Sequence, residues 1–144
     1  MAEITLPTEI LLDIVTPDRL VAHDEVTAVT IPGKDGYLGI LPGHAPLLTE
    51  LGPGELVYTS GGAQHSMAVY WGFAEVLGDC VIVLAQTCER AEEIDVERAE
   101  KAKARAEERL KRLDDPAIDR ERARESLTRA MARLEAAHKR PDPE

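Results

Sequence analysis

The segment that decides the fold runs from Ile31 to Glu55 and reads IPGKDGYLGILPGHAPLLTELGPGE. It holds six of the ten glycines and four of the nine prolines in the 144-residue chain. Glycine permits backbone angles that side chains forbid, and proline fixes φ and removes a backbone donor. The apolar residues between them are Tyr37, Leu38, Ile40, Leu41, Leu47, Leu48 and Leu51. Because a disordered linker would lack these residues, we expect an ordered, tightly turning segment of the kind that often carries function.

Short β-rich runs lie on both sides of this segment. They occupy residues 10–15, 20–22, 26–31, 56–59, 66–70, 71–77 and 80–84. Turn signals such as Pro17-Asp18 and Gly78-Asp79 stand between several of them. Short strands at such intervals are typical of a β-sandwich or barrel, and the first 88 residues have room for roughly seven to ten of them.

The net charge of −10 is unevenly distributed along the chain. Residues 1–88 contain two basic and eleven acidic residues, whereas residues 89–144 contain fifteen basic and sixteen acidic residues. This change in charge density predicts two domains, 1–88 and 89–144. An acidic first domain argues against nucleic acid as a partner, because phosphate binding needs a basic face.

The composition, 44% hydrophobic and 31% charged, is that of a globular protein. No apolar run approaches the roughly 18 residues that a membrane span requires, and the N-terminal residues do not resemble a secretory signal. Cys80 and Cys88 lack the spacing of a metal site and are interpreted as structural thiols in a reducing compartment. We therefore expect a cytoplasmic protein.

The second half predicts two helices joined by a short turn, an antiparallel hairpin. Residues 94–113 and 118–140 contain neither glycine nor proline, and Asp114-Asp115-Pro116 separates them. Asp95 and Asp119 are the candidate N-caps. The predicted apolar stripes are rich in alanine and consist of Ile94, Ala99, Ala102, Ala106, Leu110, Leu113, Ile118, Leu127, Ala130, Met131, Leu134 and Ala137. Alanine buries little area, so we expect a loosely held hairpin that can move.

Arginines follow one side of each predicted helix. At 100° per residue, Arg98, Arg105, Arg109 and Arg112 lie within about 60° of one another, and Arg122, Arg129 and Arg133 within about 40°. Two interpretations remain open for these basic ridges. They are either solvated helix faces or a site for an anion, such as a nucleotide phosphate or an acidic segment of a partner protein.

A near-repeat marks the start of each helix. Residues 94–99 and 118–123 share the pattern Ile-Asp-x-x-Arg-Ala, which is also compatible with two ordinary capped helix starts. His44 is interpreted as a residue that stabilises a turn. The sequence contains no nucleophile–base pairing, phosphate loop or dinucleotide fingerprint, so we do not expect an enzyme.

Four of these segments, taken together, resemble the epsilon subunit of bacterial F-type ATP synthases. They are residues 14–19 (IVTPDR), 36–47 (GYLGILPGHAPL), 72–76 (GFAEV) and the two-helix tail that opens at Ile94-Asp95. The resemblance implies a flattened N-terminal β-sandwich of about ten strands and a mobile C-terminal helical hairpin. It also implies a place in the rotor stalk, peripheral to the cytoplasmic face of the cell membrane, with the gamma subunit, the c-ring and the alpha/beta catalytic hexamer as partners.

The resemblance further implies two groups of site residues. The predicted contact with gamma and the c-ring comprises Tyr37, Leu38, Gly39, Ile40, Leu41, Pro42 and His44. The predicted ATP site, which follows the Ile-Asp-x-x-Arg-Ala motif of some relatives, comprises Ile94, Asp95, Arg98, Ala99, Arg105, Arg129 and Arg133. No cofactor is required, and ATP enters only as a regulatory ligand.

The function implied is that of a non-catalytic subunit, which couples proton flow to rotation and inhibits ATP hydrolysis through its hairpin. Two other classes of function remain open from the residues alone. One is a stand-alone nucleotide-sensing module, and the other is a structural adaptor that forms a coiled coil. An adaptor would need sustained heptads with larger apolar residues than these alanine-rich stripes supply.

Overall fold

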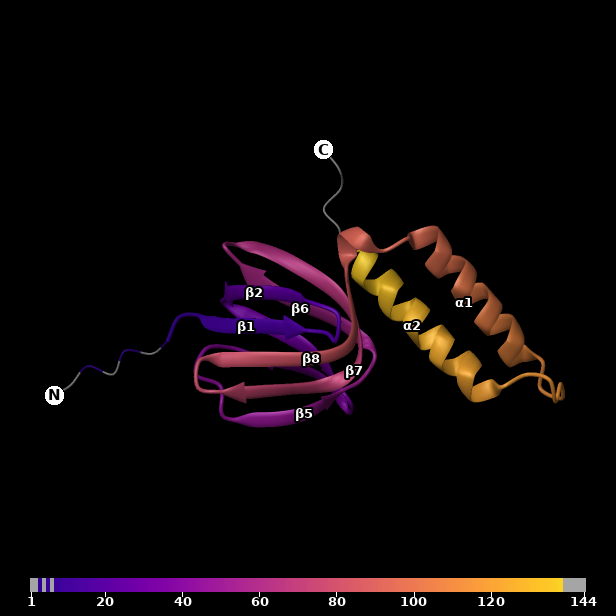
Figure 1. Cartoon of the computed structure of the whole chain (residues 1–144), viewed down its shortest axis with the longest axis horizontal. Coiled ribbons are helices and arrows are strands. Elements are labelled where there is room, and N and C mark those ends of the chain that lie inside the picture. Colours follow the sequence, from indigo (N-terminus) through magenta and orange to yellow (C-terminus); the bar gives the residue numbers. More distant parts are fainter. Residues whose placement is uncertain (1–2, 4, 6, 139–144) are drawn as a thin grey trace.

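The computed structural model describes Glu3, Thr5 and residues 7–138, and within this part eight strands precede two α-helices. The strands are β1 (Ile10–Val15), β2 (Leu20–Val26), β3 (Ala28–Gly33), β4 (Gly36–Ile40), β5 (Leu47–Leu51), β6 (Gly54–Ser60), β7 (Ala63–Leu77) and β8 (Cys80–Arg90). A short 3-10 turn, η1 (Ala91–Glu93), leads to α1 (Val96–Lys111) and α2 (Arg120–His138). The predicted β-sandwich followed by a helical hairpin is confirmed (Figure 1).

Strand β7 unites two of the predicted runs, and the described part of the chain has eight strands where about ten were predicted. The runs 66–70 and 71–77 are one continuous strand that bends at Trp71 and Gly72, both of which have positive φ. Before the bend β7 pairs with β6, and after it β7 pairs with β5. Because β8 follows β7 through the bend, these two strands pass from one layer of the sandwich to the other.

The glycine-rich segment of residues 31–55 contains two strands of its own. Lys34 and Asp35 form a two-residue turn between β3 and β4, and Gly36 after it has a φ of 138°. Strand β5 follows the Pro42-Gly43 turn and pairs with the end of β7. The segment is therefore ordered and tightly turning, as predicted.

The sandwich has a core that belongs to the strands alone. Its fully buried members include Leu12, Ile14, Ile31, Ile40, Leu56, Met67, Val81 and Val83. Alternation along each strand sends one set of side chains into this core and the other set outward. The predicted run 26–31 is divided, because Thr27 lies between β2 and β3 and its backbone N–H donates to Thr59 O at 2.9 Å.

The helices form the predicted hairpin, and both predicted N-caps are present. The Asp95 carboxylate accepts a hydrogen bond from the Arg98 N–H, and the Asp119 carboxylate accepts one from the Arg122 N–H, each at 3.1 Å. Residues 139 and 140 of the predicted second helix lie outside the described part of the chain. None of the described helices is long and apolar enough to cross a membrane.

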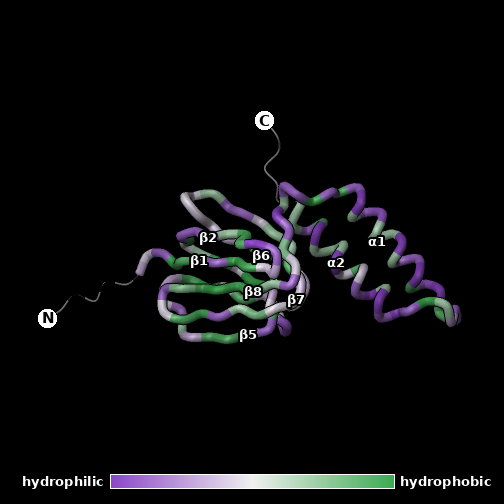
Figure 2. Tube along the Cα trace, viewed as in Figure 1, coloured by the Kyte–Doolittle hydropathy of each residue, from purple (hydrophilic) through white to green (hydrophobic). Residues whose placement is uncertain are grey.

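Helix α2 lies between the sandwich and α1 (Figure 1). A small second core joins Ala68 and Tyr70 of β7 to the hairpin residues Ile94, Ala132, Ala136 and Ala137. Hydrophilic residues predominate along both helices of the hairpin (Figure 2). The prediction that Leu113 and Met131 belong to the buried stripe is wrong, since they are 73% and 51% exposed. Alanines fill the contact because only small side chains allow α2 to approach the sheet so closely.

Candidate functional site

A cavity of about 290 Å³ lies where the end of β8, the start of α1 and the middle of α2 meet. Its lining comprises Glu89, Glu93, Asp95, Arg98, Ala99, Ala102, Arg105 and Arg133. Five of the seven predicted ATP-site residues therefore come together, although they are spread over 39 positions from Asp95 to Arg133. We call this space the junction cavity.

The other two predicted residues lie beside the junction cavity. Ile94 is buried in the small second core, where it anchors the start of the hairpin. Arg129 does not line the cavity, and its backbone carbonyl oxygen accepts a hydrogen bond of 2.9 Å from the Tyr70 hydroxyl. Both residues thus shape the position of the helices relative to the sheet.

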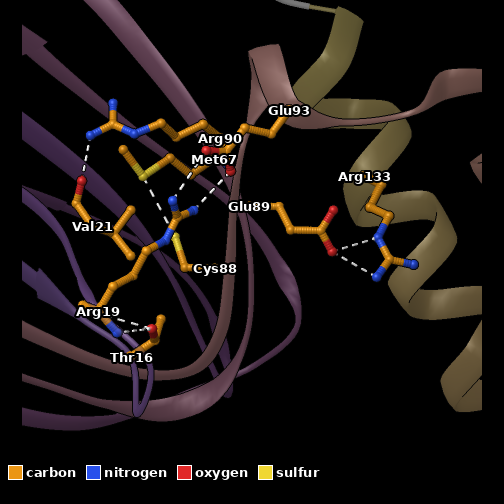
Figure 3. A network of polar contacts seen from close by, with 9 residues as sticks. All are labelled: Thr16, Arg19, Val21, Met67, Cys88, Glu89, Arg90, Glu93 and Arg133. Carbon is orange, nitrogen blue, oxygen red and sulfur yellow. Dashed lines mark hydrogen bonds and ion pairs between the residues drawn. The ribbon is translucent and has the colours of Figure 1, made fainter.

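Glu93 is tied to the β-domain. Two hydrogen bonds of 3.3 and 2.8 Å join its carboxylate to the guanidinium of Arg19, which follows the turn between β1 and β2 (Figure 3). The backbone N–H of Arg90 donates to the same carboxylate at 3.4 Å. The bonds from Arg19 lower the pKa of Glu93 below its ordinary value. Glu93 therefore fastens the linker to the sandwich immediately before the hairpin begins.

Glu89 pairs across the domain boundary with Arg133 of α2. One carboxylate oxygen of Glu89 accepts from Nε of Arg133 at 2.9 Å and from a terminal nitrogen at 2.7 Å (Figure 3). The guanidinium carbon lies 5.5 Å from the centre of the Tyr70 ring, within the range of a cation–π contact. Burial raises the pKa of Tyr70 to about 12, although Arg133 opposes the change. Tyr70 therefore presents a neutral ring to the arginine.

Arg98 and Arg105 differ from Arg133 in their partners. Within the described part of the chain, neither of their guanidinium groups makes a hydrogen bond or an ion pair. Both are exposed residues of α1. The uncompensated positive charge of the junction cavity is thus on α1. Guanidinium groups in this state can bind phosphate oxygens through paired N–H donors.

The sequence analysis missed the acidic side of the junction cavity. Glu89 and Glu93 precede α1 and share no helical spacing with the arginine ridges. Each finds its partner far along the chain, 44 residues away for Glu89 and 74 for Glu93. No local pattern could have revealed these pairs. The cavity therefore contains three acidic and three basic side chains rather than a wholly basic surface.

The second copy of the Ile-Asp-x-x-Arg-Ala pattern lines a cavity of its own. This space of about 380 Å³ lies at the other end of the hairpin and is lined by Arg109, Ala117, Ile118, Asp119, Arg122 and Ala123. Both copies begin a helix with an aspartate cap. The two positions differ because the second cavity has no lining residue from the β-domain.

The predicted rotor-contact residues lie on and beside β4. Tyr37, Gly39 and Leu41 are exposed, and Leu38, Pro42 and His44 are partly buried. Ile40 is fully buried in the sandwich core, so it supports the surface from within. The Tyr37 hydroxyl accepts from the Glu55 N–H at 3.3 Å and donates to Glu135 of α2 at 3.5 Å. Tyr37 therefore faces the docked hairpin in this conformation.

His44 has the structural role that the sequence predicts. Its backbone N–H donates to Leu41 O at 3.1 Å, and its Nδ1 lies 2.7 Å from Ala45 O. Both contacts are local to the turn between β4 and β5. His44 therefore stabilises the turn, and within the described part of the chain its ring makes no hydrogen bond with an acidic or nucleophilic side chain.

A set of apolar side chains faces solvent on the outer side of the sheet formed by β5, β7, β8, β1 and β2. Phe73 and Leu84 lie opposite each other on β7 and β8, and Leu84 is opposite Val15 on β1. We call this surface the outer apolar face, and its exposed members are Leu20, Leu48, Phe73, Leu77, Ile82 and Leu84. Glu75 lies among them, opposite Leu48 and Ile82. Exposed apolar side chains gathered on one face in this way are typical of a protein–protein contact.

Two family models together cover the described chain almost completely. The ATP synthase delta/epsilon chain β-sandwich domain matches residues 9–91, and the delta/epsilon chain long α-helix domain matches residues 92–138. The two matches meet inside η1 (Ala91–Glu93), next to the junction cavity. The match therefore extends over both the sandwich and the hairpin.

Relatives and solved structures agree with the family models. The ATP synthase epsilon chain of Koribacter versatilis is 61% identical over 98 residues, which are 68% of this chain and 69% of that one. The epsilon chain of Solibacter usitatus is 45% identical over 94% of this chain and 100% of its own length.

A chain of the Euglena gracilis mitochondrial ATP synthase, from an OSCP/F1/c-ring structure in rotational state 1, superposes with a TM-score of 0.81. It is 28% identical and covers 95% of this chain and 86% of that one. A chain of the Tetrahymena thermophila mitochondrial ATP synthase central stalk and c-ring has a TM-score of 0.58 at 14% identity, covers 92% of this chain and 99% of that one, and supports the fold alone. From the matching domains, their order and these identities, the chain belongs to the ATP synthase delta/epsilon family, with epsilon chains as its relatives.

Proposed function

We propose that this chain is a non-catalytic subunit of a proton-translocating F-type ATP synthase, where it acts in the central stalk at the cytoplasmic face of the membrane. The observation that carries this proposal is the continuous family match over both domains. The solved chain with the higher similarity comes from an assembly whose title names F1 and the c-ring. The β-domain would attach the subunit to the rotor, and the hairpin would regulate ATP hydrolysis.

The outer apolar face is the surface that we assign to the gamma subunit. Its members on β7 and β8 lie beyond the bend at Gly72, whereas α2 packs against Ala68 and Tyr70 before the bend. The loop after β4, with Leu41 and His44 at its tip, is assigned to the c-ring side. A surface of exposed leucines and phenylalanine gains free energy when a partner removes it from water, at about 25 cal/mol per Å².

The hairpin has the properties of an element that can leave its position. Its contact with the sandwich consists of the alanine-rich second core, the Tyr70 hydrogen bond and the Glu89–Arg133 pair. Alanine side chains bury little area, so this contact is worth only a few kcal/mol after ordering costs. A released hairpin would carry its arginines toward acidic segments of the catalytic hexamer, where it would inhibit ATP hydrolysis.

ATP is the regulatory ligand that we propose for the junction cavity. Arg98 and Arg105 supply guanidinium groups that have no partner among the described residues, and Arg133 approaches from α2. A triphosphate bound among them would link α1 to α2 and would offset the repulsion between the two basic ridges. Bound ATP would therefore favour the docked hairpin and relieve inhibition.

The regulatory role can be tested in the assembled ATP synthase. A chain that ends after Glu93 keeps the whole strand core and the Arg19–Glu93 pair, so it should still join the complex through its β-domain. Removing the hairpin should raise ATP hydrolysis by the complex. Unchanged hydrolysis would contradict inhibition by the hairpin, and loss of the subunit from the complex would contradict assembly through the sandwich.

The outer apolar face can be tested by one charged substitution. Leu84→Asp places a carboxylate at the centre of this face without entering the core, because Leu84 is exposed. We expect binding to the gamma subunit to weaken by at least about tenfold, which corresponds to 1.4 kcal/mol. Glu92→Asp is a control on the exposed linker. Binding that survives Leu84→Asp would remove this face from the proposal.

The nucleotide site can be tested by titrating the isolated full-length chain with ATP. ATP should raise the thermal midpoint of the wild type, and Arg98→Ala should abolish the rise, because it removes a guanidinium from the lining of the junction cavity. Arg124→Ala is the matched control, since Arg124 is exposed on α2 and does not line the cavity. No shift of the wild type at millimolar ATP would refute the nucleotide site.

A further inference from the structure

Helix α1 is attached to the rest of the molecule less firmly than α2. Because α2 lies between α1 and the sandwich, the main neighbour of α1 is α2 (Figure 1). The buried residues of α1 are Ala99 and Ala106, whose methyl groups bury little area. The ion pairs along α1 join residues four positions apart on the same side of the hairpin, so they do not hold this helix to α2.

One hydrogen bond connects the two helices, and it lies at the tip of the hairpin. A terminal nitrogen of Arg120, the first residue of α2, donates to the carbonyl oxygen of Leu110 at the end of α1 at 3.3 Å. Within the described chain, no other hydrogen bond or ion pair joins α1 to α2. The last carbonyl groups of a helix have no partner in the helix itself, so Arg120 also caps α1.

This closing contact satisfies only part of the guanidinium. The other terminal nitrogen of Arg120 is buried and has no acceptor within the described chain. A buried donor without an acceptor costs free energy, and this cost disappears when the group meets water. Opening the tip would expose the nitrogen, so the contact that closes the hairpin is also one that opens readily.

Helix α2 is held to the sandwich by contacts of several kinds. Hydrogen bonds join it to Tyr37, Tyr70 and Glu89 of the strands. Ala132 and Ala136 complete the small second core on the sheet. Separating α2 from the sandwich must break all of these contacts, whereas separating α1 from α2 breaks one hydrogen bond and an alanine contact.

The two ends of α1 differ in their freedom. Ile94 is 4% exposed in the second core and Asp95 caps the first turn, so the start of α1 stays next to the sandwich. At the other end, residues 112–119 connect the helices without helix or strand. A segment that spans about 3.3 Å per residue when extended lets the end of α1 move away from α2 while its start remains in place.

We propose that the hairpin opens in two steps, in which α1 first leaves α2 at the tip, where Arg120 closes it, while α2 stays on the sandwich. This order goes beyond the proposed function, because it is a property of the isolated chain and needs neither nucleotide nor partner. Isolated helices of roughly 12–15 residues are marginal in water, and α1 has 16 residues. Once it lifts from α2, α1 therefore loses helical hydrogen bonds.

Amide hydrogen exchange of the full-length chain, without ligand, tests the order of the steps. We expect the amides of residues 100–111 in α1 to be protected at least about tenfold less than those of residues 130–138 in α2. Equal protection of the two helices would overturn the proposal, because the hairpin would then leave the sandwich as one unit. Stronger protection of α1 would overturn it as well.

Arg120→Met tests the closing contact, since methionine keeps an apolar stem and removes every donor. Exchange in residues 100–111 should become about fivefold faster, and exchange in residues 130–138 should change by less than about twofold. Arg124→Met is the matched control. It removes the same charge from α2, but the Arg124 side chain is exposed and makes no hydrogen bond or ion pair within the described chain.

The other results for this pair of variants contradict a closing role of Arg120. If Arg120→Met accelerates both helices equally, the tip controls docking and the two steps are not separate. If it accelerates neither helix, or if Arg124→Met acts as strongly on α1, the hydrogen bond to Leu110 does not close the hairpin. Failure of ATP binding or of inhibition leaves these measurements unaffected, so the order of opening stands or falls separately from the proposed function.

Discussion

The hydroxyl of Tyr70 on β7 donates a hydrogen bond of 2.9 Å to the backbone carbonyl oxygen of Arg129 on α2. The ring that carries this hydroxyl also lies under the guanidinium of Arg133, one helical turn later. Tyr70 is only 1% exposed, although it sits on the surface of the sandwich, because α2 covers it. One aromatic side chain therefore supplies packing, a hydrogen bond and a cation–π contact to the joint between the domains.

Tyr70→Phe should loosen the hairpin without unfolding the sandwich. The change removes one hydrogen bond, worth about 1 kcal/mol, and keeps the ring beneath Arg133. Hydrogen exchange in α2 should become roughly fivefold faster. Tyr58→Phe is the control, since the Tyr58 hydroxyl donates to Asp24 at 2.8 Å between two strands. Equal acceleration of α2 in both variants would contradict a specific role of Tyr70 at the joint.

Gly72→Ala should destabilise the sandwich severely. Gly72 has a φ of 148°, and a Cβ at this position would lie 1.9 Å from the backbone oxygen of Leu84 on β8. We expect the free energy of unfolding to fall by about 3 kcal/mol or more in urea denaturation. Gly39→Ala is the control, because a Cβ there meets nothing within 4 Å. Similar losses for the two variants would show that the bend at Gly72 is not the cause.

The two cysteines should react with alkylating agents at very different rates. Burial raises the pKa of the Cys88 thiol to about 12, whereas Cys80 is exposed in the β7–β8 hairpin. Because the thiolate is the reactive form, iodoacetamide at pH 8 should modify Cys80 in the native chain and leave Cys88 unmodified. Peptide mass spectrometry measures both sites. In the fully denatured chain, the two cysteines should be labelled at similar rates. Rapid labelling of Cys88 in the native chain would contradict its burial against Met67.

Acid should weaken the attachment of the linker to the sandwich. Hydrogen bonds from Arg19 lower the pKa of Glu93 below its ordinary value of 4.5. A carboxyl with a lowered folded pKa stabilises the fold above its unfolded pKa, and this stabilisation is lost as pH falls through the folded value. The stability difference between wild type and Glu93→Gln should therefore be largest near neutral pH. It should shrink as pH falls below 4.5 and vanish once Glu93 is protonated in the folded state, as chemical denaturation at several pH values can measure.

A difference that does not shrink as pH falls below 4.5 would mean that Glu93 acts through packing and not through its charge. Glu92→Gln is the control, since Glu92 is exposed and lies one residue away in the same turn. Its stability should follow that of the wild type over the whole range.

Local features of the hairpin could be predicted from the sequence. An N-cap aspartate accepts a hydrogen bond from the backbone N–H three residues later. Because this contact is local, Asp95 and Asp119 were identifiable as caps. The absence of glycine and proline in residues 94–113 indicated a helix for the same local reason. The helix bounds differ from the prediction by about two residues, because the cap residues themselves lie outside the helix.

The face by which α2 docks could not be read from the sequence. Alanines occur around much of this helix, and the predicted stripe included Met131 and not Ala132. The structure buries Ala132 and exposes Met131, because the sheet surface around Ala68 and Tyr70 accepts a methyl group at close range. The continuity of β7 through Trp71 and Gly72 was hidden for a related reason. It depends on two different partner strands, β6 and β5, which lie elsewhere in the chain.

The sequence by itself determined the order of the domains, the caps of both helices and the turns of residues 31–55, since each depends on residues that are neighbours along the chain. The family resemblance followed from the same short motifs. Tertiary structure alone decided which arginines of the junction cavity have partners. Arg133 is neutralised by Glu89, 44 residues away, while Arg98 and Arg105 are left without a partner in the described chain. Ion pairs form between groups that are close in space, and only the packed fold of strand and helix brings these groups together.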